Sequence, residues 1–125
     1  MQTQRDDLKQ RLEEDGWQVI EEDNTKLDRW ASEIWRVESV WSPQGFSLWL
    51  TFLVDPQASP ENPKDENLWA VGTSRKLPLD QQSAQGKPLL TFGQGWGTRT
   101  SQFMSEIARI RHEAYVAKMK EKESN

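Results

Sequence analysis

The sequence contains no cysteine. Its absence excludes a disulfide framework, a thiol nucleophile and every metal site built on thiolate ligands. The only histidine is His112, so a nucleophilic triad would have to use it, and no G-x-S-x-G segment accompanies the serines. We therefore expect a non-catalytic protein that uses no cofactor and no metal.

Long apolar runs are also absent. The longest, residues 48–54, is interrupted by Thr51 and is far shorter than the roughly 20 residues that cross a bilayer. Residues 1–10 are polar and of mixed charge, which is not typical of a signal peptide. Because the lack of cysteine also suits a reducing compartment, we expect a soluble cytoplasmic protein without a membrane partner.

Acidic side chains outnumber basic ones in the first third of the chain. Residues 1–41 hold 11 acidic and 6 basic side chains, residues 98–125 hold 4 and 6, and the net charge is −4. Non-specific binding to nucleic acid depends on neutralising phosphates, so we expect no nucleic-acid partner. The acidic runs 13–15 and 21–23 lack the ligand spacing of a calcium loop, and we interpret them as solvated surface.

Tryptophan, by contrast, is abundant: the chain has seven in 125 residues, a length typical of one domain. We expect a single domain over 1–125. Residues 3–15 predict a helix, with Thr3 and Asp6 forming a capping box and Gly16 ending it. Leu8 and Leu12 give this helix a thin apolar stripe, so it should pack against another element.

The clearest feature of the central region is a hairpin. Residues 33–41 and 46–54 are read as its two strands and flank the segment 42–45, whose proline and glycine suit a type I turn. A four-residue loop pairs Trp41 with Phe46 and brings apolar side chains together on one face. These side chains are Trp35, Val37, Trp41, Phe46, Leu48, Leu50 and Phe52.

Further strands are predicted at 17–22, 67–74 and 88–92, with a turn at 21–24. Residues 25–32 fit either a helix or a strand. The segments 55–66, with three prolines, and 77–87 are read as loops. The strand at 67–74 should place Trp69, Val71 and Thr73 on one side.

The last element is a long helix over about 98–120, capped by Thr98 or Thr100 and followed by a frayed tail at 121–125. Its apolar stripe has a core line and a wider margin. The core line is Phe103, Ile107, Ile110, Ala114 and Ala117, and the margin is Met104, Ala108, Tyr115 and Met119.

Successive strands between two helices indicate an α+β fold. We expect an antiparallel sheet of four to five strands in chain order, with a short N-terminal and a long C-terminal helix packed mainly on one face. Phe103, Ile107 and Ile110 should meet the apolar face of the hairpin.

The opposite face of the sheet would then remain open, and its composition suggests a function. An apolar and aromatic patch bordered by charge is typical of a protein interface. We therefore predict a small protein-interaction module, such as an adaptor, assembly factor or regulatory subunit, that binds a protein partner or self-associates. The candidate surface is Ile34, Arg36, Glu38, Val40, Trp49 and Leu53.

An alternative site is the glycine-rich loop 93–97 before the last helix. Helix N-termini preceded by glycines can hold anions through free N–H groups, which would make the protein a small-ligand or anion binder. The candidate residues are Gly93, Gly95, Gly97, Thr98 and Arg99. The spacing matches neither a dinucleotide fingerprint nor a P-loop, which favours the reading that the glycines serve to turn Trp96 into the core.

Overall fold

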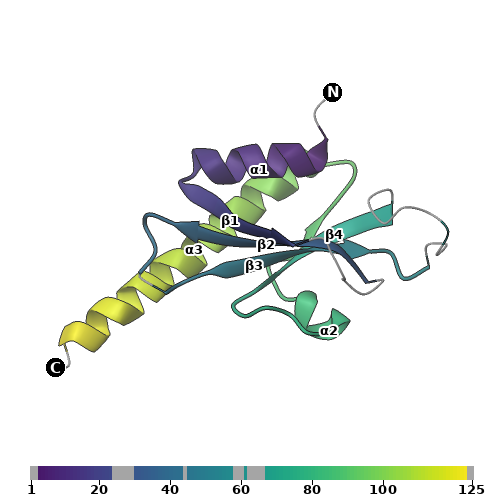
Figure 1. Cartoon of the computed structure of the whole chain (residues 1–125). Helices are drawn as coiled ribbons and strands as arrows, with labels where there is room; N and C mark the ends of the chain where they lie inside the picture. Colours follow the sequence, from purple (N-terminus) through teal and green to yellow (C-terminus); the bar gives the residue numbers. More distant parts are fainter. Residues whose placement is uncertain (1–2, 24–29, 44, 58–60, 62–66, 124–125) are drawn as a thin grey trace.

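The computed structural model describes residues 3–23, 30–43, 45–57, 61 and 67–123. Three helices and five strands follow one another in an α+β arrangement, as predicted (Figure 1). In chain order they are α1 (Gln4–Glu14), β1 (Trp17–Asp23), β2 (Ala31–Ser39), β3 (Leu48–Val54), β4 (Leu68–Ser74), α2 (Gln81–Ala84), β5 (Leu90–Thr91) and α3 (Trp96–Glu123).

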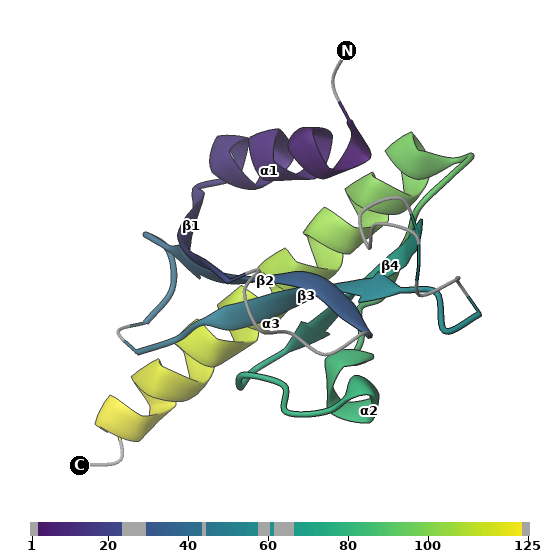
Figure 2. The same cartoon turned by 45° about the vertical axis from the view of Figure 1, so that its right-hand side comes forward.

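The five strands form one antiparallel sheet in the order β1-β2-β3-β4-β5, which confirms the predicted succession. The long helix α3 crosses one face of this sheet diagonally, and α1 lies on the same side (Figure 2). We call this side the core face. The main core is a continuous cluster that includes Leu8 and Leu12 of α1, Trp17, Trp35, Val37, Phe46, Leu48, Leu50, Phe52, Val71 and Leu90 of the sheet region, and Phe103 and Ile107 of α3.

The boundaries of α1 follow local chemistry. Thr3 accepts a hydrogen bond from the backbone of Asp6, and the Asp6 side chain accepts one from the backbone of Thr3, which completes the predicted capping box. Gly16 has a φ of 84° and follows the last turn, a conformation that glycine adopts without strain. Both leucines of the stripe are fully buried.

The hairpin register differs by two residues from the predicted one. The prediction placed Trp41 opposite Phe46, whereas the observed sheet pairs Val37 with Leu48, and the connection spans residues 40–47 instead of four. A shift of two residues leaves every side chain on its original face, so alternation alone cannot distinguish the two registers.

The second face of the sheet is partly covered, which the sequence did not predict. The short helix α2 lies within the segment 77–87, which was predicted to be a loop, and packs Ala84 against Leu53. A register shift between Leu53 and Val54 also moves Trp69 to this cluster, while Val71 and Thr73 stay buried with the main core side of the strand.

Two other boundaries differ from prediction. β1 continues through residues 21–23, where a turn was expected, and pairs with β2 after an irregularity next to Val19. α3 begins at Trp96, two residues before the predicted start, so neither Thr98 nor Thr100 caps it; the Thr100 hydroxyl instead donates to the Trp96 carbonyl. The helix also continues to Glu123 into the segment that was expected to fray.

Some sequence predictions fall largely outside the described residues. Of the ambiguous segment 25–32, only residues 30–32 are described, and Ala31 already lies in β2. Of the predicted loop 55–66, residues 55–57 and 61 are described, and none lies in a helix or strand.

Candidate functional site

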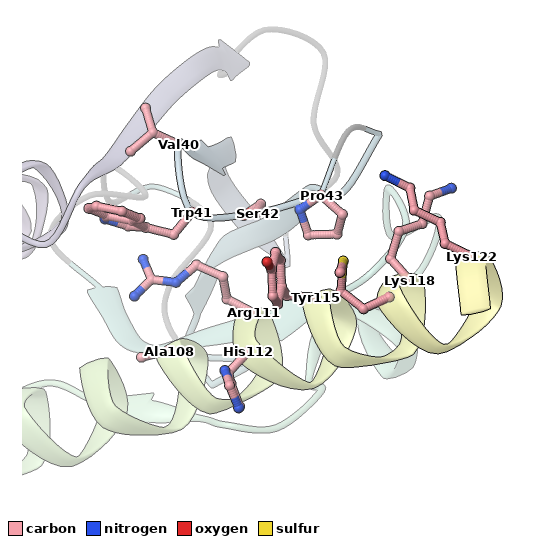
Figure 3. Close-up of a pocket in the computed structure, with 11 residues that line it drawn as sticks. Val40, Trp41, Ser42, Pro43, Ala108, Arg111, His112, Tyr115, Lys118 and Lys122 are labelled. Atoms are coloured by element: carbon pink, nitrogen blue, oxygen red, sulfur yellow. The ribbon is translucent and has the colours of Figure 1, made fainter.

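A cleft with a volume of about 600 Å³ lies between the C-terminal half of α3 and the β2–β3 connection (Figure 3). The described residues of its lining come from the β2–β3 connection and from α3. The connection contributes Val40, Trp41, Ser42 and Pro43, and the helix contributes Ala108, Arg111, His112, Tyr115, Lys118, Met119 and Lys122. The helical residues recur at three- and four-residue intervals, so they share one face of α3.

The helical wall exists because α3 is longer than the strands that it crosses. Its 28 residues extend about 42 Å at 1.5 Å per residue, and the nine residues of β2, the longest strand, extend about 30 Å. The C-terminal end therefore projects past the sheet (Figure 1). There the apolar stripe loses its cover, and Tyr115 and Met119 are 47% and 41% exposed.

The opposite wall is the connection after β2. Ser42 N–H donates to the Ser39 carbonyl at 3.0 Å, and Phe46 N–H donates to the Pro43 carbonyl at 3.1 Å, so two successive turns shape this wall. Phe46 is buried in the main core, whereas Trp41, predicted on the core face, is 66% exposed. The prediction is wrong because β2 ends at Ser39. Trp41 therefore lies beyond the strand, in the connection, and not on the covered face of the sheet.

Arg111 holds the inner end of the cleft together. It donates to the Asp15 carbonyl at 3.2 Å and to Ser39 Oγ at 3.0 Å, and its guanidinium lies 4.9 Å from the centre of the Trp17 ring. These contacts join α3 to the C-terminal end of α1 and to the last residue of β2. Arg111 Nη2 also lies 3.7 Å from the Asp15 carboxylate. The charge of Arg111 is therefore already paired within the fold.

Lys118 and Lys122 give the outer end of the cleft its positive charge. In Figure 3 both side chains lie at the open end beyond Pro43, and Tyr115 stands between the helix and the loop. Neither lysine forms an ion pair within the part of the chain that the structure describes. The His112 ring points away from the loop (Figure 3). No carboxylate lies among the described residues that line the cleft.

The interaction surface predicted on the second sheet face is only partly accessible. Ile34 and Leu53 are 3% and 1% exposed, so the expectation of an open face is wrong at these two positions. Leu53 packs with Ala84 of α2 and with the half-buried indoles of Trp30 and Trp69. This cover depends on α2, and the sequence of this short helix has no apolar periodicity from which it could have been predicted.

The other four residues of that surface lie toward the β2–β3 connection. Arg36 Nη1 donates to Glu38 Oε1 at 2.8 Å, and Ser47 Oγ donates to the same oxygen at 3.0 Å. The Arg36 guanidinium lies 5.9 Å from the centre of the half-buried Trp49 ring. Val40 is strongly exposed and belongs to the cleft.

The glycine-rich segment forms a turn that leads directly into α3. Gly93 and Gly95 have φ values of 111° and 78°, which L side chains rarely adopt. Because the helix begins at Trp96, Gly97 and Thr98 lie in its first turn and not in a loop. Trp96 packs against the main core and stacks on Phe92, with the two ring centroids 5.2 Å apart.

Several polar groups around this turn already have partners. Gln4 accepts from the Gly93 N–H at 3.1 Å and donates to the Gly93 carbonyl at 3.2 Å, and Arg99 Nε donates to the Thr91 carbonyl at 3.2 Å. The carboxylate of Asp7 accepts a hydrogen bond from the first residue of α3. It brings negative charge to the same helix end. Anion binding here stays a prediction from the sequence that no contact in the structure favours.

The described residues contain neither a cluster of metal ligands nor a helix that could cross a membrane. No three histidine, aspartate or glutamate side chains there gather as metal ligands would. No helix of the described chain combines the length and apolar character needed to cross a membrane.

The cleft was not predicted from the sequence, although one signal pointed to it. Tyr115 and Met119 were predicted to lie on the apolar stripe of the last helix, with no role assigned to them. The predicted helix over 98–120 would extend about 35 Å, and a predicted nine-residue strand about 30 Å. This mismatch indicates an uncovered helix end, but not which loop lies beside it.

Comparison of the chain with protein-family models, with curated proteins and with solved structures finds no match. The function is therefore argued from the geometry of the described residues.

Proposed function

We propose that this protein is a small non-catalytic protein-interaction module, and that the cleft between α3 and the β2–β3 connection is its binding surface. The observation that carries the proposal is the gathering of Trp41, Tyr115 and Met119, whose large side chains are all exposed, around one cavity. Large apolar side chains of this kind are costly to leave in water, and contiguous exposure of them is typical of an interaction site.

The composition of the cleft supports binding to a protein. Aromatic residues, methionine and arginine are enriched in interfaces, while the border of an interface is polar. Trp41, Tyr115, Met119 and Arg111 supply the first set, and Lys118 lies at the outer border. A general acid–base pair would need two ionisable groups aimed at a common substrate position, and the lining residues described above do not suggest one.

Site-specific photo-crosslinking in the cells that produce the protein tests this proposal. A photoreactive phenylalanine analogue is placed at Tyr115 or at Glu106, which is also exposed and lies on α3 but does not line the cleft. We expect a discrete covalent protein adduct from position 115 and none from position 106. Exposed helix positions tolerate such a change with little loss of stability.

Two variants distinguish the cleft from the sheet face predicted by sequence. Trp41→Ser should abolish the adduct from position 115, and Trp49→Ala should leave it unchanged. The proposal fails if positions 106 and 115 give the same products, or if only Trp49→Ala removes the adduct. The second result would return the interface to the second face of the sheet.

A further inference from the structure

The charge of the cleft is opposite to that of the protein as a whole. The chain carries a net charge of −4, yet the described lining contains three permanent cations and no carboxylate. Arg111 is committed to Asp15 and Ser39. Lys118 and Lys122 have no ion pair in the described chain, so the open end of the cleft offers two uncommitted positive charges.

The cleft also has a length and a direction. From Ala108 to Lys122 the lining follows one face of α3 over 15 residues, a rise of about 21 Å along the helix axis. Apolar side chains occupy the inner and middle parts, and lysines the outer end (Figure 3). An amphipathic helix bound in a groove uses anchors at similar three- and four-residue intervals. A partner helix of about four turns would match this face.

We infer that the partner supplies an acidic amphipathic helical segment, whose apolar side chains enter between Trp41 and Met119 and whose carboxylates meet Lys118 and Lys122. The inference rests on the proposed function and specifies the chemistry of the partner. Complementary charge at the border of an apolar groove selects partners and orients them along the groove.

Other occupants fit the charges less well. In a symmetric dimer the same patch meets itself, so two copies joined through this cleft would bring together two patches whose described linings each hold three cations and no carboxylate. An anionic membrane or a nucleic acid would meet the cleft but also the acidic remainder of the chain, and binding of either depends on many cations at once.

Selection from a random peptide library tests the inference on the purified full chain. Peptides about 16 residues long are selected on the wild type and counter-selected on Tyr115→Ser. We expect the enriched peptides to be acidic, with apolar residues at three- and four-residue spacing, and to shift the NMR signals of the Trp41 indole N–H and of residues 108–122. Their Kd should rise about 10-fold in the Lys118→Glu, Lys122→Glu double variant.

The matched control is Lys76→Glu, Lys87→Glu, which changes the net charge by the same amount at two exposed positions away from the cleft. It should leave the Kd within about 2-fold, because exposed charges a Debye length away are screened. Peptides that require Tyr115 but carry no negative charge would overturn the inference and leave the proposed function standing.

Three further results would overturn it. They are a failure to enrich any peptide that depends on Tyr115, a concentration-dependent dimer that Lys118→Glu strengthens, and tighter binding of phosphatidylserine vesicles or of single-stranded RNA than of the acidic peptides. The photo-crosslinking result at position 115 decides separately whether the protein binds a partner there at all.

Discussion

Asp7 connects the first helix to the start of the last one. Its carboxylate accepts hydrogen bonds from Trp96 Nε1 at 2.7 Å and from Arg11 Nε at 2.8 Å. The bond from Trp96, followed by the bond and charge of Arg11, holds the pKa of Asp7 below its ordinary value of 3.8. Because the pKa is lower in the folded protein, the ionised carboxylate stabilises the fold above that ordinary value, and this contribution is lost as the pH falls through the folded pKa.

Replacing the carboxylate should therefore have a pH-dependent effect. We expect Asp7→Asn to lower the free energy of unfolding by about 1 kcal/mol at pH 7, since it weakens two charge-assisted hydrogen bonds at a partly exposed site. The difference from the wild type should shrink below about pH 4, as the wild-type carboxyl becomes protonated. Urea denaturation across this pH range measures both the loss of unfolding free energy at pH 7 and its decrease at low pH. Glu13→Gln, an exposed change on the same helix, should show no such trend.

Gly16 combines a backbone requirement with a close contact. Its φ is 84°, and a Cβ at this position would lie 2.8 Å from Trp41 Nε1. Gly16→Ala should cost about 1–2 kcal/mol, from the backbone strain and from displacement of the indole, and should shift the NMR signal of the Trp41 indole N–H.

Gly45 provides the control for this change. It has a φ of 85°, but nothing lies within 4 Å of its Cβ position. Gly45→Ala should therefore show the backbone cost alone, about 1 kcal/mol, with no shift at the Trp41 indole. Equal costs and unchanged indole signals in both variants would mean that Trp41 does not rest against Gly16.

At the scale of elements, the position of α2 depends on a glycine in the neighbouring strand. A Cβ at Gly72 would lie 1.8 Å from the Ala84 carbonyl oxygen, so the strand and the helix backbone are in direct contact. Asp80 caps α2 by accepting from the Ser83 N–H at 2.7 Å. Four residues cannot form a stable helix alone, and α2 therefore depends on this packing.

Gly72→Ala should push α2 away from the sheet. We expect a loss of about 2 kcal/mol or more, typical of overpacking in a buried contact, and faster hydrogen exchange in the segment that contains α2. Gly97→Ala is the matched change in the first turn of α3, where nothing lies within 4 Å; it should be neutral or slightly stabilising. An unchanged exchange pattern in Gly72→Ala would contradict the packing described above.

At the scale of the whole molecule, α3 divides into a buried and a projecting half. Phe103 and Ile107 are part of the main core, whereas Tyr115 and Met119 are exposed, and the C-terminal end of the helix projects past the sheet (Figure 1). Local opening is easier where few apolar contacts must be broken.

Hydrogen exchange on the isolated protein should reveal this gradient. We expect amides around Phe103 and Ile107, and those of β2 and β3, to exchange only through global unfolding. Amides after residue 115 should exchange at least about 100-fold faster, because local fraying exposes them at much lower free energy. Equal protection along α3 would contradict a free helix end and would indicate that self-association covers it.

Local chemistry allowed much of the fold to be predicted. The capping box of Thr3 and Asp6, the left-handed Gly16 and the alternation in the central strands each depend on near neighbours in the chain. These interactions gave the first helix, the antiparallel succession of strands and the face that meets α3. They did not give the register, because a shift of two residues preserves the facing of every side chain.

The candidate site depended instead on contacts between distant segments. Trp41 is exposed because β2 ends before it and its indole lies beside Gly16. Tyr115 is exposed because α3 extends past the sheet. The same tertiary packing buried Leu53 under α2. The sequence by itself determined which residues are apolar and which faces they share, since both follow from side-chain chemistry and backbone period. Only the tertiary structure decided which of those faces remain uncovered, because that depends on the relative lengths and positions of elements far apart in the chain.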